Sequence, residues 1–353
     1  MRASLWPGLL LWVAFAPAQA QSRHASGGSA CANCHASEAM DQARTPMALA
    51  LAVPGANRVL ETHPKLTVRK GTYTYTVETH GKESTYSVTD GAQTVSSPIH
   101  WGFGAGAQTW VLERGGKFYE SLVSFYPAIK GLDTTTGDER LTPHSVQEAF
   151  GRELSQDESK ACFDCHATNT QLNGGLNLQS MKPGLTCERC HAGAGTHMAE
   201  ISLKKLGPAP QALGALSSEG ISDFCGQCHR PWELVVRSGW RGEMNVRFQP
   251  YRLANSRCFN GADRRISCLA CHDPHHDVVR TSSAYDAKCL ACHASSSPLV
   301  PATAAETPKS CPIAKTDCTS CHMPKVALPG GSSHLTFTDH QIRVVRPGDP
   351  YPN

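Results

Sequence analysis

The sequence predicts a chain of mostly short helices and loops with an inserted antiparallel β-subdomain. The pattern C-x-x-C-H occurs seven times and uses 14 of the 16 cysteines, so much of the chain must be organised around it. The 30 glycines and 23 prolines favour turns and loops over long helices. One long interval without the pattern instead alternates Thr, Tyr and Val with polar residues, which is typical of half-buried strands.

Residues 1–20 have the features of an export signal. Arg2 supplies a positive charge, the apolar run LLLWVAFA follows, and AQA ending at Ala20 fits the small-residue cleavage rule. That run is much shorter than the roughly 20 apolar residues of a transmembrane helix, and no later stretch approaches this length. We therefore expect export to the periplasm or another extracytoplasmic compartment, and no transmembrane segment.

The seven copies of C-x-x-C-H are Cys31–His35, Cys162–His166, Cys187–His191, Cys225–His229, Cys268–His272, Cys289–His293 and Cys318–His322. This spacing is typical of haem c attachment, because two thiols three residues apart can each form a thioether to one haem and the next residue then lies under the iron. The predicted thioether-forming residues are Cys31, Cys34, Cys162, Cys165, Cys187, Cys190, Cys225, Cys228, Cys268, Cys271, Cys289, Cys292, Cys318 and Cys321. The predicted proximal iron ligands are His35, His166, His191, His229, His272, His293 and His322.

Other chemistries of a C-x-x-C pair fit this pattern less well. A zinc site combines two such pairs and gives no reason for a His after the second Cys every time. A thioredoxin-like dithiol needs one motif inside a βαβ unit, and a disulfide framework leaves seven histidines unexplained. We therefore expect a multihaem cytochrome c fold, with short helices and loops wrapped around seven covalently bound haem c groups and their iron.

Ten further histidines are available as second axial ligands. A histidine three to six residues after a proximal ligand is tethered on the wrong side of its own haem, so it should bind a neighbouring haem. Position along the chain predicts the distal ligands His197, His275 and His340, with His276 as the alternative to His275. Further candidates are His63, His100, His144 and His334.

Three local expectations accompany these ligands. Thr142 as N-cap and Pro143 as the first helical residue predict that a helix begins beside His144. His80 is expected in an exposed turn between strands. Cys258 and Cys311 lie outside the seven motifs, and in an oxidising compartment a disulfide between them is the favoured hypothesis.

The chain divides into four predicted parts. Residues 1–20 are the signal peptide, 21–60 the first haem segment, 61–130 a β-rich subdomain and 131–353 a six-haem cytochrome domain. The alternating stretches at 66–91 and 107–126 predict about four or five antiparallel strands. Residues 131–140 are expected to form a linker.

Three motif regions carry a resemblance to a known group of proteins. PGLTCERCHAGAGTH resembles an element of multihaem c-type cytochromes of the tetrahaem electron-carrier type, which are related in haem packing to pentahaem nitrite reductases and octahaem hydroxylamine oxidoreductases. CLACHDPHH and CTSCHMPK with FTDHQIR are similar to segments of that superfamily, and the resemblance implies that His275 and His340 are distal ligands. All seven motifs end in His, whereas the nitrite reductases usually carry a C-x-x-C-K haem at the active site.

These features predict electron transfer between other redox proteins, through closely spaced and mostly bis-His haems. The alternative is a multihaem oxidoreductase that acts on a small nitrogen or sulfur compound at one open-faced haem. A third interpretation is a filament-forming or surface-exposed conduit in which the β-subdomain is an interaction module. The 33 basic and 30 acidic residues give no strongly basic region, so nucleic-acid binding is not expected.

Overall fold

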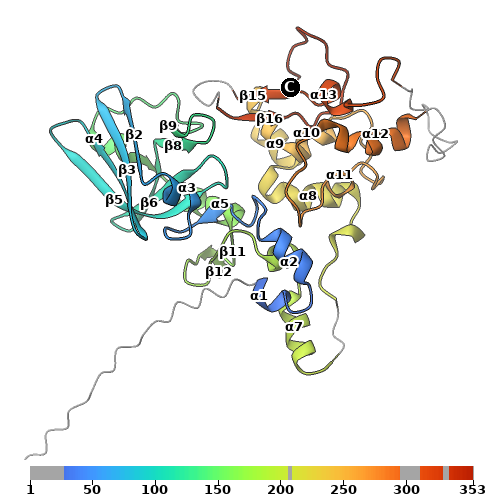
Figure 1. Ribbon diagram of the computed structural model, residues 1–353, viewed down its shortest axis with the longest axis horizontal. Helices are drawn as coiled ribbons and strands as arrows, with labels where there is room; N and C mark the ends of the chain where they lie inside the picture. Colours follow the sequence, from blue (N-terminus) through green and yellow to red (C-terminus); the bar gives the residue numbers. More distant parts are fainter. Residues whose placement is uncertain (1–27, 206–208, 295–310, 329–333, 353) are drawn as a thin grey trace, which may run out of the picture.

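A computed structural model describes residues 28–205, 209–294, 311–328 and 334–352. The predicted signal peptide lies outside these residues. The described chain forms a β-sheet lobe and a second lobe of short helices, with the first helices below and between them (Figure 1). Within this part of the chain, no helix is both long enough and apolar enough to cross a bilayer.

The β-sheet lobe is built on one antiparallel sheet of eight strands, in the order β10-β7-β6-β5-β4-β3-β2, with β1 paired to β5. The strands are β1 (Leu51–Ala52), β2 (Lys65–Lys70), β3 (Tyr73–His80), β4 (Glu83–Thr89), β5 (Thr94–Phe103), β6 (Thr109–Arg114), β7 (Lys117–Ser121) and β10 (Gly151–Glu153). Alternate residues of β4 and β5 are buried, so the period-two pattern of the sequence is confirmed as strand structure. His80 ends β3 and is exposed, as predicted.

The sheet includes residues that lie before and after the predicted β-rich subdomain in the sequence. β1 lies in the predicted first haem segment, and β10 lies in the predicted six-haem domain. The predicted linker at 131–140 is wrong in part, because its first residues form β9 (Gly131–Thr134), which pairs with β8 (Val123–Tyr126). Strands of two to four residues leave too little alternation for a sequence pattern to reveal them.

The largest apolar core of the described residues lies within this lobe. Trp110 and Tyr86 are fully buried, and Phe150 packs edge-on against Tyr86 with ring centres 5.6 Å apart. A second cluster surrounds Phe163 of helix α5 (Gln156–His166), where Trp101 meets the Phe163 ring edge-on with ring centres 5.2 Å apart. This cluster fixes the helix that ends in the second C-x-x-C-H motif to the face of the sheet.

The remaining elements are short. The helices are α1 (Gly28–Cys31), α2 (Ala36–Gln42), α3 (Arg58–Thr62), α4 (Val146–Phe150), α5 (Gln156–His166), α6 (Cys187–Cys190), α7 (Ala194–Ser202), α8 (Ser218–His229), α9 (Trp232–Ser238), α10 (Gln249–Ala254), α11 (Cys268–Cys271), α12 (Asp286–His293) and α13 (Cys318–His322). Short 3₁₀ turns are η1 (Leu213–Ala215), η2 (Glu243–Arg247) and η3 (Ser282–Tyr285). Two-stranded pairs join β11 (Ala167–Thr168) to β14 (Lys182–Pro183), β12 (Gln171–Leu172) to β13 (Gly175–Leu176) and β15 (Lys325–Ala327) to β16 (Thr336–Thr338).

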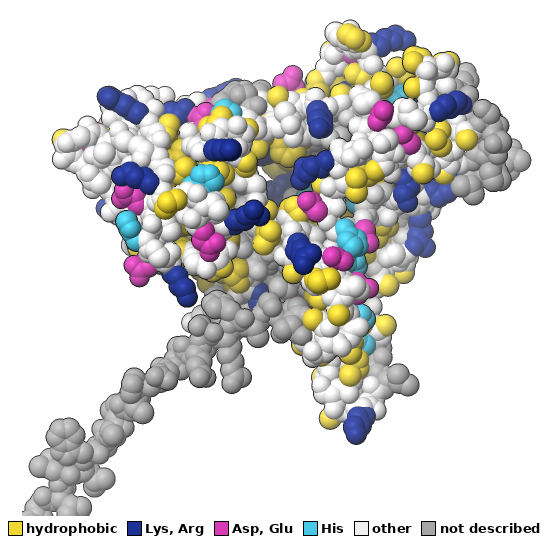
Figure 2. Space-filling view, in the orientation of Figure 1, with side chains coloured by type: hydrophobic (Ala, Val, Ile, Leu, Met, Phe, Trp, Pro, Cys, Tyr) yellow, Lys and Arg dark blue, Asp and Glu magenta, His cyan; other side chains and the backbone are white. Residues whose placement is uncertain are grey.

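The helical lobe has a much smaller apolar cluster than the sheet lobe. Among the described residues it consists of Val235, Phe248 and Tyr251. Figure 2 shows a hollow between the two lobes with Lys and Arg side chains around it. Side-chain packing therefore accounts for the interior of the sheet lobe far better than for that of the helical lobe.

The segment after the first motif packs against the segment before the third. The Gln42 side chain donates to the Leu185 carbonyl at 2.7 Å, and the Leu185 amide donates to the Met47 carbonyl at 3.0 Å. Gly184 has a φ of +72°, and a Cβ there would lie 1.8 Å from the Ala48 carbonyl oxygen. Glycine is thus required for this approach, which brings two motifs that are distant in sequence close together.

Candidate haem-binding site

Each described C-x-x-C-H motif is built around a helical turn. Helices α6 and α11 span the two cysteines of their motifs, and α5, α8 and α12 each end on the motif histidine. In the first motif, the His35 amide donates to the Cys31 carbonyl at 2.8 Å, which closes the same kind of turn. Residues three apart lie on one helix face, so the two thiols of a motif are presented on the same side.

Three motif histidines donate a hydrogen bond from Nδ1 to a backbone carbonyl. His166 bonds to Ala50 at 2.9 Å, His191 to Gln211 at 3.2 Å and His322 to Arg343 at 2.9 Å. A carbonyl only accepts, so Nδ1 carries the proton and the neutral ring keeps its lone pair on Nε2. Metal-binding histidines commonly have this arrangement, which fixes both the tautomer and the ring orientation.

Burial keeps several of these imidazoles neutral. It lowers the pKa of His166 and His272, and it lowers the pKa of His340 to about 4 against a smaller opposing effect of the hydrogen bond to the Thr338 carbonyl. A neutral imidazole is the form that binds a metal. The protonation state and the tautomer of these rings therefore suit an iron ligand.

Two pairs of histidines from different parts of the chain lie close together. The rings of His191 and His275 have centres 6.1 Å apart and planes at 9°, and those of His272 and His340 have centres 6.2 Å apart and planes at 45°. A metal–imidazole bond is about 2 Å long and the ring centre lies about 1 Å beyond the nitrogen, so two imidazoles on opposite sides of one metal have centres about 6 Å apart. Both pairs have the separation that one iron between them requires.

The turn after the fifth motif directs its two extra histidines differently. The Asp273 carboxylate accepts from the His275 amide at 2.9 Å and lies 3.0 Å from its Nδ1. His276 is exposed and lies 3.7 Å from an Asp41 carboxylate oxygen on α2. The His276 amide donates to the Asp273 carbonyl at 3.1 Å, so Pro274 lies inside a turn at 273–276 that places His275 beside the third motif and His276 beside the first helices.

A buried ion pair holds the segment that carries His340. Arg252 of α10 and Asp339 are both fully buried, and they form two parallel N–H···O bonds of 2.8 and 2.9 Å. Arg252 also donates to the Pro352 carbonyl at 2.8 Å, and its guanidinium lies 4.5 Å from the centre of the Tyr351 ring. This network fixes the position of Asp339 and therefore also that of His340, the next residue along the chain.

The remaining predicted distal ligands lie elsewhere. His63 packs on Phe125 at 4.7 Å, His100 is exposed beside Trp101, and His334 packs on Tyr126 while its Nε2 lies 2.8 Å from an Asp133 oxygen. These contacts place the three on the β-sheet lobe. His197 on α7 instead has a buried Nδ1 with no hydrogen-bond partner.

His144 is exposed, and the predicted helix start beside it is wrong in its details. Helix α4 begins at Val146, and the N-cap is Ser145, whose side chain accepts from the Glu148 amide at 3.2 Å. Ser145 stands immediately before Val146, the first buried apolar residue of the helix. The burial of Val146 determines where the helix begins, and Ser145 caps that first turn. Thr142 lies too far upstream for that role.

Thiols of different motifs lie close enough for one to affect the pKa of the other. The pairs are Cys31 with Cys187, Cys165 with Cys228, Cys225 with Cys268, and Cys289 with Cys318. The first motif thus lies beside the third, the second beside the fourth, the fourth beside the fifth, and the sixth beside the seventh. Groups attached to these cysteines would be close neighbours.

The predicted disulfide between Cys258 and Cys311 is not formed in the structure, where both thiols are free. Burial raises the pKa of Cys258, whereas hydrogen bonds with the backbone at Ala314 and Ile313 lower the pKa of Cys311.

Sequence reasoning missed the ion pair of Arg252 and Asp339. The one available signal was the acidic residue directly before His340 in FTDHQIR, and its partner lies 87 residues away along the chain. Among the residues that the structure describes, no group of three or more Cys, His, Asp or Glu side chains is arranged to hold a bare metal ion.

Comparison with known proteins gives a match to a family model. Residues 131–192 match the family model of cytochrome c554 and c-prime, and this segment contains the second and third motifs. No curated protein and no solved structure matches the chain. The family match supports a c-type cytochrome with covalently bound haem, and thereby an electron carrier that works with redox partners.

Proposed function

We propose that the chain is an exported heptahaem c-type cytochrome that carries electrons between redox proteins. The observation that supports this most strongly is the proximity of thiols from motifs that are remote in sequence. Thioether bonds at adjacent motifs would hold the cofactors side by side. Haem c supplies one-electron chemistry through its iron, and the chain supplies attachment, axial ligation and spacing.

The axial ligation in this proposal follows from the paired rings. His191 and His275 would bind one iron, and His272 and His340 another, each through Nε2. His275 would thus serve the haem of the third motif although it follows the fifth motif in sequence. His197, with its unpartnered buried Nδ1, is a further distal candidate.

The small apolar cluster of the helical lobe also supports the proposal. Val235, Phe248 and Tyr251 bury too little surface to organise that lobe alone, and porphyrin surface would supply the missing interior. The haem-free chain should then be much less ordered in this lobe than in the β-sheet lobe.

The intact mass of the purified holoprotein tests the cofactor number. We expect the mass of the chain without residues 1–20 plus seven haem groups, and the paired variant Cys289→Ala/Cys292→Ala should carry six. A wild-type protein with fewer than seven haems, or with its motif cysteines in disulfides, would contradict the proposal.

A further inference from the structure

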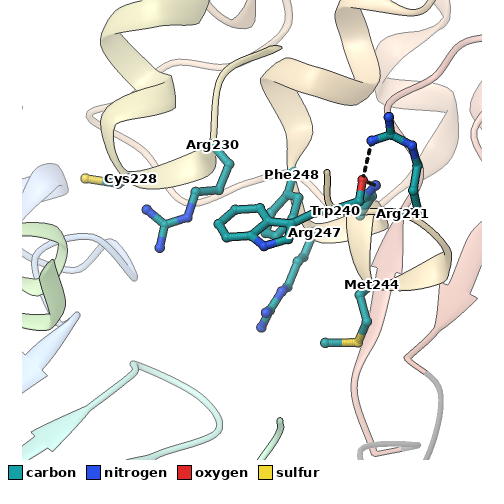
Figure 3. Close-up of a pocket in the computed structure, with 8 residues that line it drawn as sticks. Cys228, Arg230, Trp240, Arg241, Met244, Arg247 and Phe248 are labelled. Carbon is teal, nitrogen blue, oxygen red and sulfur yellow. Dashed lines mark hydrogen bonds between the residues drawn. The ribbon is translucent and has the colours of Figure 1, made fainter. Parts of the chain in front are cut away.

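A cavity of about 620 Å³ opens beside the fourth motif. It is bounded by Cys228, Arg230, Trp240, Asn245, Arg247 and Phe248 (Figure 3). Its size is within the range of about 300–1,000 Å³ that is typical of pockets for small molecules and cofactors. The thiol of Cys228 stands at one end, and the arginines line the space beyond it.

The charge of this cavity is unbalanced. Three arginines line it and no carboxylate does. Burial lowers the pKa of Arg247, the nearby charge of Arg230 lowers it further, and Glu139 opposes this effect. Within the described residues, neither Arg230 nor Arg247 forms an ion pair, although each would gain from a nearby anion.

Buried polar atoms of the same cavity also lack partners. The Nε of Arg247 has no hydrogen-bond acceptor. Asn245 is fully buried, and its Oδ1 has no donor although its Nδ2 bonds to the Trp240 carbonyl at 3.0 Å. Buried polar groups normally have a partner, so these two atoms leave an unsatisfied polar environment beside the cavity.

The three arginines differ in orientation. Figure 3 shows the guanidinium groups of Arg230 and Arg247 in the open space, with Arg230 nearer to Cys228. Arg230 lies 5.9 Å from the Trp240 ring centre and Arg247 lies 5.4 Å from that of Phe248, and such stacking holds a planar cation in place. Arg241 instead turns back and donates to the Trp240 carbonyl at 2.8 Å.

We propose that Arg230 and Arg247 bind the propionate carboxylates of the haem attached to Cys225 and Cys228. The inference rests on the proposed function. It gives two residues outside all seven motifs a role in setting the reduction potential of one haem. The thioethers join one edge of a haem and the propionates leave from the opposite edge, which matches a thiol at one end of the cavity and cations beyond it. Guanidinium groups bind carboxylates in bidentate geometry, so arginine suits this task better than lysine.

The consequence is a higher reduction potential for this haem. Reduction removes one positive charge from the iron, so fixed positive charges nearby favour the reduced form. Arg247 lies in a partly desolvated site, where its charge is screened less than that of an exposed arginine. The two residues are positioning and tuning groups and take no part in covalent attachment.

The test compares Arg230→Gln and Arg247→Gln with the control Arg241→Gln in the seven-haem holoprotein. Redox titration followed by visible and EPR spectra should show one of the seven midpoint potentials shifted downward in each of the first two variants. Arg241→Gln should shift this potential less than either, because its guanidinium turns back to the Trp240 carbonyl, and Arg247→Lys should restore part of the shift. Intact mass is measured on the same samples, so a wild-type protein lacking seven haems would count against the proposed function itself.

Two outcomes would overturn the inference while leaving the proposed function intact. One is that both glutamine variants carry seven haems with seven unchanged potentials. The other is that added phosphate or nitrite, at concentrations that do not alter the Arg247→Gln protein, shifts the wild-type potential of one haem, because the arginines would then bind an anion from solution.

Discussion

Replacing Asp339 with Asn should lower the free energy of unfolding by about 3–5 kcal/mol, because the buried Arg252 guanidinium loses its counter-charge. The side chains of both residues are fully buried, so water cannot replace the lost partner. Arg343, whose Nη1 lies 2.5 Å from Asp339 Oδ2, loses the same acceptor. Chemical denaturation of the holoprotein, followed by circular dichroism, measures the effect.

The matched control is Glu233→Gln, which breaks the exposed pair with Arg237 on α9. Exposed pairs contribute little, so this variant should unfold close to the wild type. A holoprotein with Asp339→Asn that is as stable as the wild type would show that the buried pair does not hold the C-terminal segment. Loss of one low-spin haem in the same variant would further link the pair to the position of His340.

Replacing His275 with Ala should convert one ferric haem of seven from low spin to high spin. The ring of His275 lies 6.1 Å from that of His191, and its removal would leave the iron of the third motif without a sixth ligand. EPR of the oxidised variant measures the spin state, and added imidazole should restore the low-spin signal.

His276→Ala is the control, because it removes the adjacent imidazole, which is exposed and directed toward Asp41. It should leave all seven spin states unchanged. If His275→Ala kept the wild-type spectrum and His276→Ala produced the high-spin signal, the pairing proposed for this turn would be wrong.

The sequence predicts local features of this fold well where they depend on short periodic patterns. The alternation in β4 and β5 places their buried residues correctly, because side chains of a strand point to opposite faces in turn. β1 and β10 were not predicted, since each has two or three residues and becomes a strand only by pairing with β5 or β7. The helix beside His144 was predicted with the wrong cap, because the packing of Val146 selects Ser145.

In the candidate site, too, the sequence predicts the local features and not the tertiary partners. The motif cysteines and histidines can be named from sequence because haem attachment needs five consecutive residues. The partners of His275 and His340 depend on tertiary contacts. The short distance along the chain from His272 to His275 indicates that they do not bind the same iron, but the sequence does not show that His275 pairs with His191 or that His340 pairs with His272. Arg252 and Arg247 carry no local signal at all, because an arginine becomes informative only when its burial and its partners are known.

EPR of the fully oxidised wild-type holoprotein tests the central claim most directly. The paired rings predict low-spin ferric haems at the third and fifth motifs, and a carrier without an open iron site predicts a spectrum that nitrite and hydroxylamine leave unchanged. A high-spin haem whose signal shifts with either compound would contradict this account and would instead indicate an open coordination site for substrate chemistry.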